Sequence, residues 1–385
     1  MLTFNESMSQ HIIYMDYQAS TPIDARASNA MIAAYKDAYG NPSSPHLAGM
    51  QASSALEASR WAISKYLNIA PASLHFTSGS TEANNLAIKG VCRPRSRGHI
   101  ISCATEHKSV LNPLHQLRQE GFEVTILPVA NDGSIDLDEL RRVLRPDTIL
   151  GSFMFANNEI GTIHPVREIA KILHAGRILF HCDATQGLAN FRVHPRALGI
   201  DLMSCSSHKL YGPKGCGFLY VDPDAIDSAA MRAELLGGEQ EGSIRAGTQN
   251  VPGIVGLAEA FRVLDETIEA DQIDNECKRA AFLKGIQKKF DCQINGSATA
   301  RIASNLSISF KERSAMDILR KAPQILASMG SACGSLDSEG SHVLKAIGLS
   351  TNYISSTIRF GFGRSTSLAE VERAATMIAS CTSAK

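Results

Sequence analysis

Net charge, long apolar runs and an export signal are all missing from this sequence. The 385 residues carry 38 Lys and Arg against 38 Asp and Glu, so the formal net charge is zero. A neutral total gives no electrostatic reason to expect direct nucleic-acid binding. No stretch approaches the roughly 18 consecutive apolar residues of a membrane-spanning helix, and the first residues lack the basic start and apolar core of a secretory signal. We therefore expect a cytoplasmic protein without a membrane segment.

Paired cysteine spacing is also missing. None of the nine cysteines belongs to a CxxC motif; they are Cys92, Cys103, Cys182, Cys205, Cys216, Cys277, Cys292, Cys333 and Cys381. Reduced thiols fit this scatter better than a disulfide framework or a zinc site, so no metal site is expected. Cys103, Cys182 and Cys205 lie in apolar runs and are expected to be buried.

Cys333 has different surroundings from most of the other cysteines. The segment ASMGSACGSLDSEGSH (327–342) sets it among Gly, Ser and Ala, with almost no apolar bulk beside it. A mobile and accessible thiol is what sulfur transfer requires. Taken alone, the segment fits equally well a loop cysteine without a function.

The chain is longer than a single core usually supports, so two domains are expected. Between about residues 75 and 260, apolar runs such as HIISCA (99–104), RILFHCD (177–183) and DLMSCS (201–206) alternate with amphipathic stretches. This alternation predicts an α/β domain with a mainly parallel sheet covered on both faces. A charge-rich helical stretch and short strands follow and predict a smaller α+β domain. We place the large domain at 15–260 and the small domain at 261–385, which residues 1–14 could join.

Two motifs in the large domain carry a lysine and an aspartate that suit a carbonyl cofactor. Lys209 in SSHKLYGPKGCG (206–217) follows a predicted strand, where its amine could form a Schiff base. Asp183 in HCDATQG (181–187) ends a predicted strand, and its carboxylate could hold a protonated pyridine nitrogen. The alternatives are a surface lysine and an aspartate that caps the next helix.

Two further motifs sit where helices are expected to begin. Ser80 and Thr81 in FTSGSTEANNLAIKG (76–90) precede an amphipathic helix, whose start favours a phosphate group. His107 in TEHKSV (105–110) could stack on a cofactor ring or carry protons. An ordinary helix cap and a helix-start histidine are the alternatives.

Two residues could contact a substrate. Asn158 in FANNEIG (155–161) could hydrogen-bond a substrate or cofactor oxygen, although turns also favour asparagine. Arg359 in STIRFGFGR (356–364) presents the planar fork that suits the carboxylate of an amino acid. A surface ion pair is the commoner use of an arginine.

In their joint order and spacing, these segments resemble the cysteine desulfurases. The resemblance begins at YMDYQASTPID (14–24) and GNPSSPHLAG (40–49) and ends at Arg364, so it covers nearly the whole chain. It implies the pyridoxal-5′-phosphate (PLP)-dependent aminotransferase-like fold (fold type I). It also implies removal of sulfur from L-cysteine, which gives L-alanine and a persulfide on Cys333. The GSAC motif resembles the long-loop subgroup of the iron–sulfur and nitrogenase type.

The resemblance also implies a role for each matching residue. Lys209 would form the Schiff base and move the substrate proton, and His107 would stack on the ring and act in acid–base steps, including formation of the Cys333 thiolate. Arg359 would hold the substrate carboxylate, with Asn158 near substrate and cofactor. The remaining cofactor contacts implied are Asp183 at the pyridine nitrogen, Gln186 near the ring hydroxyl, and Ser80, Thr81, Ser206, His208 and Thr248 at the phosphate. The phosphate reached by Thr248 would belong to the neighbouring subunit, which implies a homodimer with shared active sites.

The resemblance leaves the sulfur acceptor open. An acceptor protein is expected, in iron–sulfur assembly, tRNA thiolation or DNA phosphorothioation. The same fold also carries selenocysteine lyases, cystine lyases and aminotransferases. The GSAC motif favours a sulfur-accepting nucleophile over these. A non-catalytic sulfur-transfer partner is the alternative of another class, and the complete set of Lys209, Asp183, His107 and Cys333 argues against it.

Overall fold

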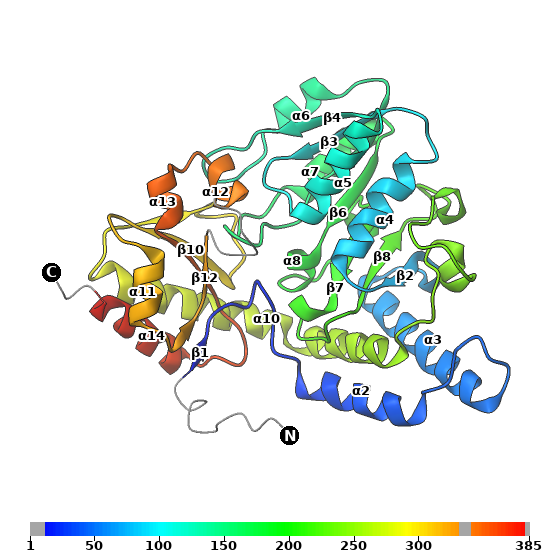
Figure 1. Cartoon of the computed structure of the whole chain (residues 1–385), viewed down its shortest axis with the longest axis horizontal. Helices are drawn as coiled ribbons and strands as arrows, with labels where there is room; N and C mark the ends of the chain where they lie inside the picture. Colours follow the sequence, from blue (N-terminus) through cyan, green and yellow to red (C-terminus); the bar gives the residue numbers. More distant parts are fainter. Residues whose placement is uncertain (1–11, 331–339, 382–385) are drawn as a thin grey trace.

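A seven-stranded sheet forms the centre of the larger part of the molecule (Figure 1). The computed structural model describes residues 12–330 and 340–381. In sequence order the strands are β2 (Leu74–Thr77), β3 (His99–Cys103), β4 (Glu123–Leu127), β5 (Thr148–Ser152), β6 (Leu179–Asp183), β7 (Leu202–Ser206) and β8 (Gly217–Val221). Their spatial order is β2-β8-β7-β6-β5-β3-β4. Only β8 runs antiparallel to its neighbours, so the sheet is mainly parallel, as predicted.

Helices cover both faces of this sheet, and the alternation of side chains along each strand explains why. Ile100, Leu150 and Leu202 face a core that contains α4 (Ser80–Cys92) and α5 (Lys108–Gln119). The neighbouring strand positions Ile101 and Met203 face a second core on the opposite side. The helices of that side are α3 (Leu47–Leu67), α6 (Leu137–Val143), α7 (Val166–Ala175), α8 (Thr185–Leu188) and the start of α10 (Val251–Gln287). The predicted α/β fold class is therefore confirmed.

The second part of the molecule has its own sheet and core. Its antiparallel sheet has the order β12-β13-β10-β9. The elements here are β9 (Cys292–Asn295), β10 (Asn305–Phe310), α11 (Ala315–Lys321), β11 (Ile325–Leu326), β12 (Ser328–Met329), α12 (His342–Ala346), α13 (Thr351–Ser355), β13 (Thr357–Gly361) and α14 (Leu368–Ser380). β1 (Ile13–Tyr14) pairs with β11, and Ile13 and Met15 lie in the core of this part.

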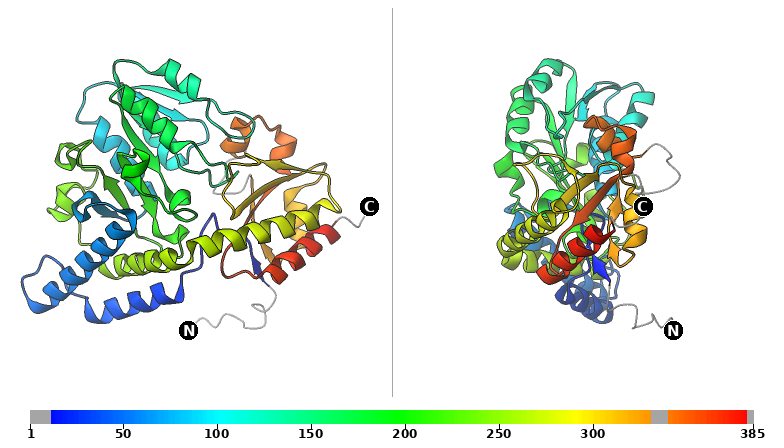
Figure 2. Two further views of the ribbon diagram at one scale, coloured as in Figure 1. Left: turned by 180° about the vertical axis from the view of Figure 1, so that it is seen from behind. Right: turned by 90° about the vertical axis from the view of Figure 1, so that its left-hand side faces the viewer.

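The 37-residue helix α10 joins the two parts (Figure 2). It packs against α2 (Ala25–Asp37) and α3 at one end and against α14 at the other. Phe261 lies in the core of the large sheet, whereas Phe282 stacks on Phe360 of β13 with the ring centroids 4.6 Å apart. The helix therefore continues without a break through residues 260 and 261. The predicted boundary between the large domain (15–260) and the small domain (261–385) stays a prediction.

Buried cysteines and the lengths of the helices agree with the sequence-based expectations. Cys103, Cys182 and Cys205 are fully buried, and burial raises the pKa of each thiol. Among the described residues, no helix has the length and apolar character needed to cross a membrane.

A substitution at Gly217 tests how closely β8 packs against β7 and the start of α4. A Cβ at this position would lie 2.3 Å from the backbone oxygen of Cys205 and 2.6 Å from the Cα of Gly79. Both neighbours are backbone atoms, which cannot rotate away. We expect Gly217→Ala to lower the free energy of unfolding by about 1–3 kcal/mol, measured by chemical denaturation.

Gly215 supplies the matched control for this substitution. Its ideal Cβ position has open space around it, and its φ of +76° is one that asparagine tolerates. Gly215→Asn should therefore leave the unfolding midpoint close to that of the wild type. An unchanged midpoint for Gly217→Ala would contradict the close packing described here.

Candidate functional site

The polar residues predicted from the sequence gather at the carboxyl edge of the parallel strands. Asp183 is the last residue of β6, and Ser206 is the last residue of β7. His107 follows β3 and forms the N-cap of α5, and Lys209 ends the short 3₁₀ helix η2 (Ser207–Lys209) just after β7. Ligands of open α/β sheets bind at this edge. The fold therefore brings together four of the predicted site residues.

Lys209 lies against the backbone that precedes α2. Its Nζ donates hydrogen bonds to the carbonyl oxygens of Gln18 and Ala19, both at 2.7 Å. Gln186 Nε2 donates to the same Gln18 oxygen at 3.3 Å. The two predicted residues Lys209 and Gln186 thus converge on one backbone segment.

The Asp183 carboxylate is buried, with an exposed fraction of only 8%. Its Oδ2 accepts a hydrogen bond from Asn84 Nδ2 at 2.8 Å, and its Oδ1 accepts one from the backbone N–H of Thr185 at 3.1 Å. Both donors are neutral, and within the described ranges no Lys or Arg forms an ion pair with this carboxylate. The hydroxyl of Thr185 is buried without a hydrogen-bond partner in the described part of the chain. A buried carboxylate in such surroundings suits a cationic ligand group.

His107 is held at its Nδ1 atom. This nitrogen lies 2.7 Å from Ser109 Oγ and accepts a hydrogen bond from the Ser109 backbone N–H at 3.1 Å. The ring keeps a solvent-accessible face, yet the surrounding protein removes enough water to lower its pKa. The nearby Asp183 carboxylate opposes this shift and Lys209 adds to it. His107 is therefore neutral at pH 7.

The start of α4 offers backbone N–H groups without a capping side chain. The N-cap is Gly79, with φ of +151°, a conformation that favours glycine. A Cβ there would lie 3.3 Å from Ser206 Oγ, so the end of β7 adjoins the helix start that carries Ser80 and Thr81. Hydroxyl and N–H groups at a helix start form the donor set that an anion such as phosphate requires.

His208 lies close to this region and is neutral. Burial lowers its pKa to about 4, and the charges of Lys209 and Lys214 add to the shift. Its Nδ1 lies 3.2 Å from Ser20 Oγ. A neutral imidazole can still donate one hydrogen bond to an anion.

Arg359 links the small sheet to the edge of the large one. It extends from β13, where its Nη1 donates to the backbone oxygen of Asn158 at 3.3 Å. Its Nη2 forms an ion pair with Asp16 Oδ1 at 2.8 Å. The pair is nearly buried, because the Arg359 side chain is only 6% exposed. The fold thus brings the two predicted substrate contacts together.

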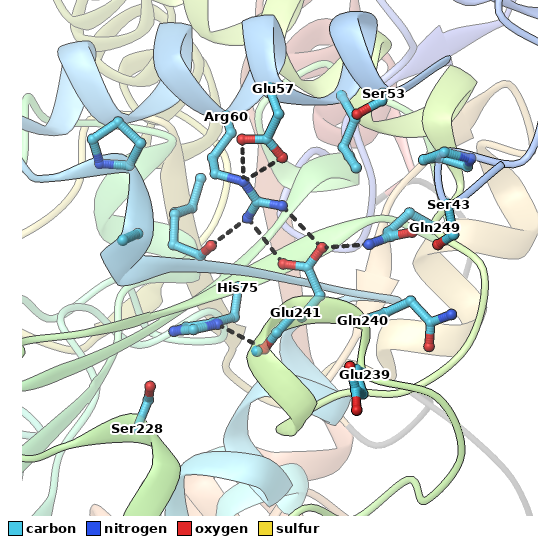
Figure 3. A pocket seen from close by; sticks show the side chains of 16 residues that line it. Ser43, Ser53, Glu57, Arg60, His75, Ser228, Glu239, Gln240, Glu241 and Gln249 are labelled. Atoms are coloured by element: carbon cyan, nitrogen blue, oxygen red, sulfur yellow. Dashed lines mark hydrogen bonds and ion pairs between the residues drawn. The ribbon is translucent and has the colours of Figure 1, made fainter. Parts of the chain in front are cut away.

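Thr248 lies elsewhere on this chain. It is exposed between η4 (Gln240–Ser243) and α10, and its neighbour Gln249 lines a separate pocket of about 960 Å³ (Figure 3). In that pocket Arg60 donates to both carboxylate oxygens of Glu241, at 2.9 and 3.0 Å, and Gln249 donates to the same carboxylate at 3.1 Å. The ion pair fixes the segment that carries Thr248. Cys333, the predicted sulfur acceptor, lies outside the described residues.

The sequence reasoning missed five residues that shape this site: Asp16, Gln18, Asn84, Glu106 and Ser109. Asn84 is fully buried on α4, on the face that also buries Ala87 and Ile88, and a polar position on the inner face of a predicted helix is a signal that could have found it. Glu106 lies three residues after the end of the apolar strand β3, which is a comparable signal. Gln18 contributes its backbone oxygen, for which no sequence signal exists.

Glu106 is a carboxylic acid buried beside this edge. Its Oε1 accepts a hydrogen bond from the Met154 backbone N–H at 2.6 Å, and its Oε2 has no partner in the described part of the chain. Burial raises its pKa to about 8, and the charge of Asp183 adds to the shift. Glu106 is therefore mainly protonated at pH 7.

Comparisons with known proteins agree with this geometry. Residues 13–374 match the aminotransferase class-V family, and the chain belongs to that family. A protein of Anaeromyxobacter sp. (strain K) named cysteine desulfurase IscS is 40% identical over 366 residues, which cover 94% of this chain and 90% of that protein.

Two solved structures extend the likeness. One titled NifS-like protein has a TM-score of 0.89 at 31% identity and covers 96% of this chain and 98% of its own. Another, titled SspA in complex with cysteine, has a TM-score of 0.81 at 32% identity and covers 91% of this chain and 99% of its own. The predicted resemblance to the cysteine desulfurases is confirmed, as is the fold type that it implied.

The raised pKa of Glu106 predicts a pH dependence of stability. The carboxyl has an ordinary pKa of 4.5 in the unfolded chain and about 8 in the folded one. The folded state therefore binds more protons between these values, so stability falls as pH rises through this window. We expect Glu106→Gln, which cannot ionise, to gain about 2 kcal/mol relative to wild type between pH 5 and pH 7, measured by urea denaturation. A constant difference between the two proteins would mean that Glu106 ionises normally.

Proposed function

We propose that this protein is a PLP-dependent cysteine desulfurase, which converts L-cysteine to L-alanine and takes the sulfur as a persulfide on Cys333. The single observation that carries the proposal is the buried Asp183 carboxylate, which has only neutral hydrogen-bond donors and lies at the same sheet edge as Lys209. The names of the relatives support the choice of reaction.

The residues present fit PLP. Lys209 supplies the amine, Asp183 the carboxylate for the pyridine nitrogen, His107 a ring to stack on it, and Gln186 a donor near its hydroxyl. Ser80, Thr81, Ser206 and His208 would hold its phosphate beside the start of α4. When bound, the cofactor supplies an electron sink that makes the Cα proton of an amino acid acidic.

Lys209 and Cys333 carry the transfer. Lys209 removes the Cα proton and later returns one, because its amine lies at the same sheet edge as Asp183 and can act as a base once substrate has displaced it from the cofactor. The Cys333 thiolate attacks the substrate sulfur, a sulfur–sulfur bond forms, and the carbon–sulfur bond of cysteine breaks. The electron pair of that bond stays on carbon, which takes up a proton to become the methyl group of alanine. An acceptor protein then receives the sulfur.

Arg359 binds the substrate carboxylate. Its guanidinium stands next to Asn158 and is paired with Asp16, so its position is fixed before substrate arrives. A planar fork of this kind binds a carboxylate through two hydrogen bonds. Asn158 contributes to the same subsite.

The protein acts as a homodimer in which Thr248 reaches the phosphate site of the partner subunit. Two observations support this arrangement. The segment of Thr248 is exposed yet anchored by the Arg60–Glu241 ion pair. In addition, α2, α3 and the segment between them expose large apolar side chains, which are Ile32, Tyr35, Tyr39, Leu47, Met50 and Trp61. Exposed apolar side chains in such number favour a protein interface.

The reaction is tested by measuring alanine and sulfide from L-cysteine in the presence of a thiol reductant. We expect the wild type to make both in equal amounts. Cys333→Ser should keep the visible absorbance of the bound cofactor and lose activity, because no thiol receives the sulfur. Lys209→Ala should lose both the activity and the absorbance band of the lysine-bound cofactor.

Cys277→Ser is the matched control, because Cys277 is an exposed cysteine on α10, away from the sheet edge that carries Lys209. It should retain full activity. Full activity in Cys333→Ser would overturn the persulfide step and favour a lyase that releases sulfur without a protein nucleophile.

The shared site is tested by charging the exposed apolar face. Leu47 and Met50 are 71% and 61% exposed on α3, so aspartates there should not disturb the fold of one chain. We expect Leu47→Asp combined with Met50→Asp to give a monomer in sedimentation experiments and to weaken PLP retention, since Thr248 is then lost from each site. A stable dimer with unchanged retention would contradict this interface.

A further inference from the structure

A chain of buried hydrogen bonds connects Asp183 to His107. Asn84 Nδ2 donates one hydrogen to Asp183 Oδ2 and the other to Ser109 Oγ, both at 2.8 Å. Ser109 Oγ in turn lies 2.7 Å from His107 Nδ1. Asn84 is fully buried and Ser109 is 7% exposed, so water does not compete for these bonds. The network joins α4, α5 and the end of β6.

The chemistry of the donors fixes the proton positions along this chain. A carboxylate only accepts hydrogen bonds, so the amide nitrogen of Asn84 must face Asp183. The second amide hydrogen of Asn84 is donated to Ser109 Oγ. Because this oxygen accepts from Asn84, its own hydroxyl proton is free to be donated to His107. The backbone N–H of Ser109 points at the same ring nitrogen from 3.1 Å. Two donors therefore face His107 Nδ1, which leaves that nitrogen without a proton and puts the ring proton on Nε2.

We propose that Asn84 and Ser109 are positioning residues that hold His107 as a neutral imidazole with its proton on Nε2. His107 then serves the proposed reaction as a hydrogen-bond donor and stacking ring. It does not take a proton at Nε2, in contrast to the expectation that it generates the Cys333 thiolate. The inference rests on the proposed function for the identity of the ring that His107 contacts.

The charged groups around His107 do not determine which of its ring nitrogens carries the proton. The groups that face it are Asp183 from β6, Lys209 from η2, His342 from α12 and Glu159 from the segment after β5. Asp183 and Glu159 favour the imidazolium, whereas Lys209 and His342 disfavour it. Burial is the largest influence on the pKa of His107 and lowers it, and the charges oppose one another. Burial and these charges act on the ring as a whole, so the two donors at Nδ1 decide which nitrogen carries the proton.

The test is ¹⁵N NMR of the PLP-loaded protein labelled at histidine, with the His107 signals assigned by their loss in His107→Gln. We expect an unprotonated Nδ1 and a protonated Nε2 from pH 6 to pH 8. Ser109→Ala removes the hydroxyl donor and should give a mixture of tautomers. Ser109→Thr keeps the hydroxyl and should restore the wild-type signals.

Asn84→Ala should change the His107 signals in the same direction as Ser109→Ala. It should also lower kcat about tenfold, as the loss of an orienting partner does for metal-bound histidines. Asn85 is the matched control, because its amide lies next in α4 but donates only to the Thr81 backbone oxygen at 2.8 Å. Asn85→Ala should leave the tautomer unchanged.

The outcomes separate this inference from the proposed function. A protonated Nδ1 in the wild type would overturn the inference, as would Ser109→Ala and Asn84→Ala spectra identical to those of the wild type. Wild-type protein that makes no alanine but shows the expected ring signals would overturn only the proposed function.

Discussion

The site depends on the Asp183 carboxylate, which is buried and forms no ion pair with a Lys or Arg within residues 12–330 and 340–381. Burying an ionised group is costly unless hydrogen bonds or an opposite charge compensate. At Asp183 the protein supplies two neutral donors, and the end of a central strand supplies the rigidity. The same edge of the sheet carries the lysine on η2 and adjoins the start of α4. These groups together are what the proposed cofactor requires.

The parallel sheet brings the residues of the site together, because the ends of several strands lie at one edge. Because β7, β6, β5, β3 and β4 are parallel, their carboxyl ends meet at one edge, although their sequence positions are far apart. A polar residue then reaches this edge if it is the last residue of its strand or lies a few residues after it. The small sheet adds Arg359 from the far end of the sequence, and the backbone of Gln18 and Ala19 closes the remaining side around Lys209.

The side chains predicted from the sequence are those whose chemistry is distinctive, namely Lys209, Asp183, His107 and Arg359. Each of them lies within a predicted apolar strand or a few residues after one, and this position could be recognised from the sequence. Asn84 and Ser109 were not identified, because an amide and a hydroxyl in helices have many ordinary uses. Their partners become known only when α4, α5 and β6 are placed in space. The continuity of α10 through residue 260 was also not foreseen, since a change in composition does not require a break in a helix.

The unbroken course of α10 affects how the site can respond to a substrate. A helix with no interruption over 37 residues resists bending, and it is anchored in both cores, through Phe261 and Phe282. The small sheet therefore packs on one end of a continuous helix whose other end packs against the large sheet. Because one continuous helix is packed in both cores, the distance between Arg359 on the small sheet and Asn158 on the large part of the molecule is set by the fold itself.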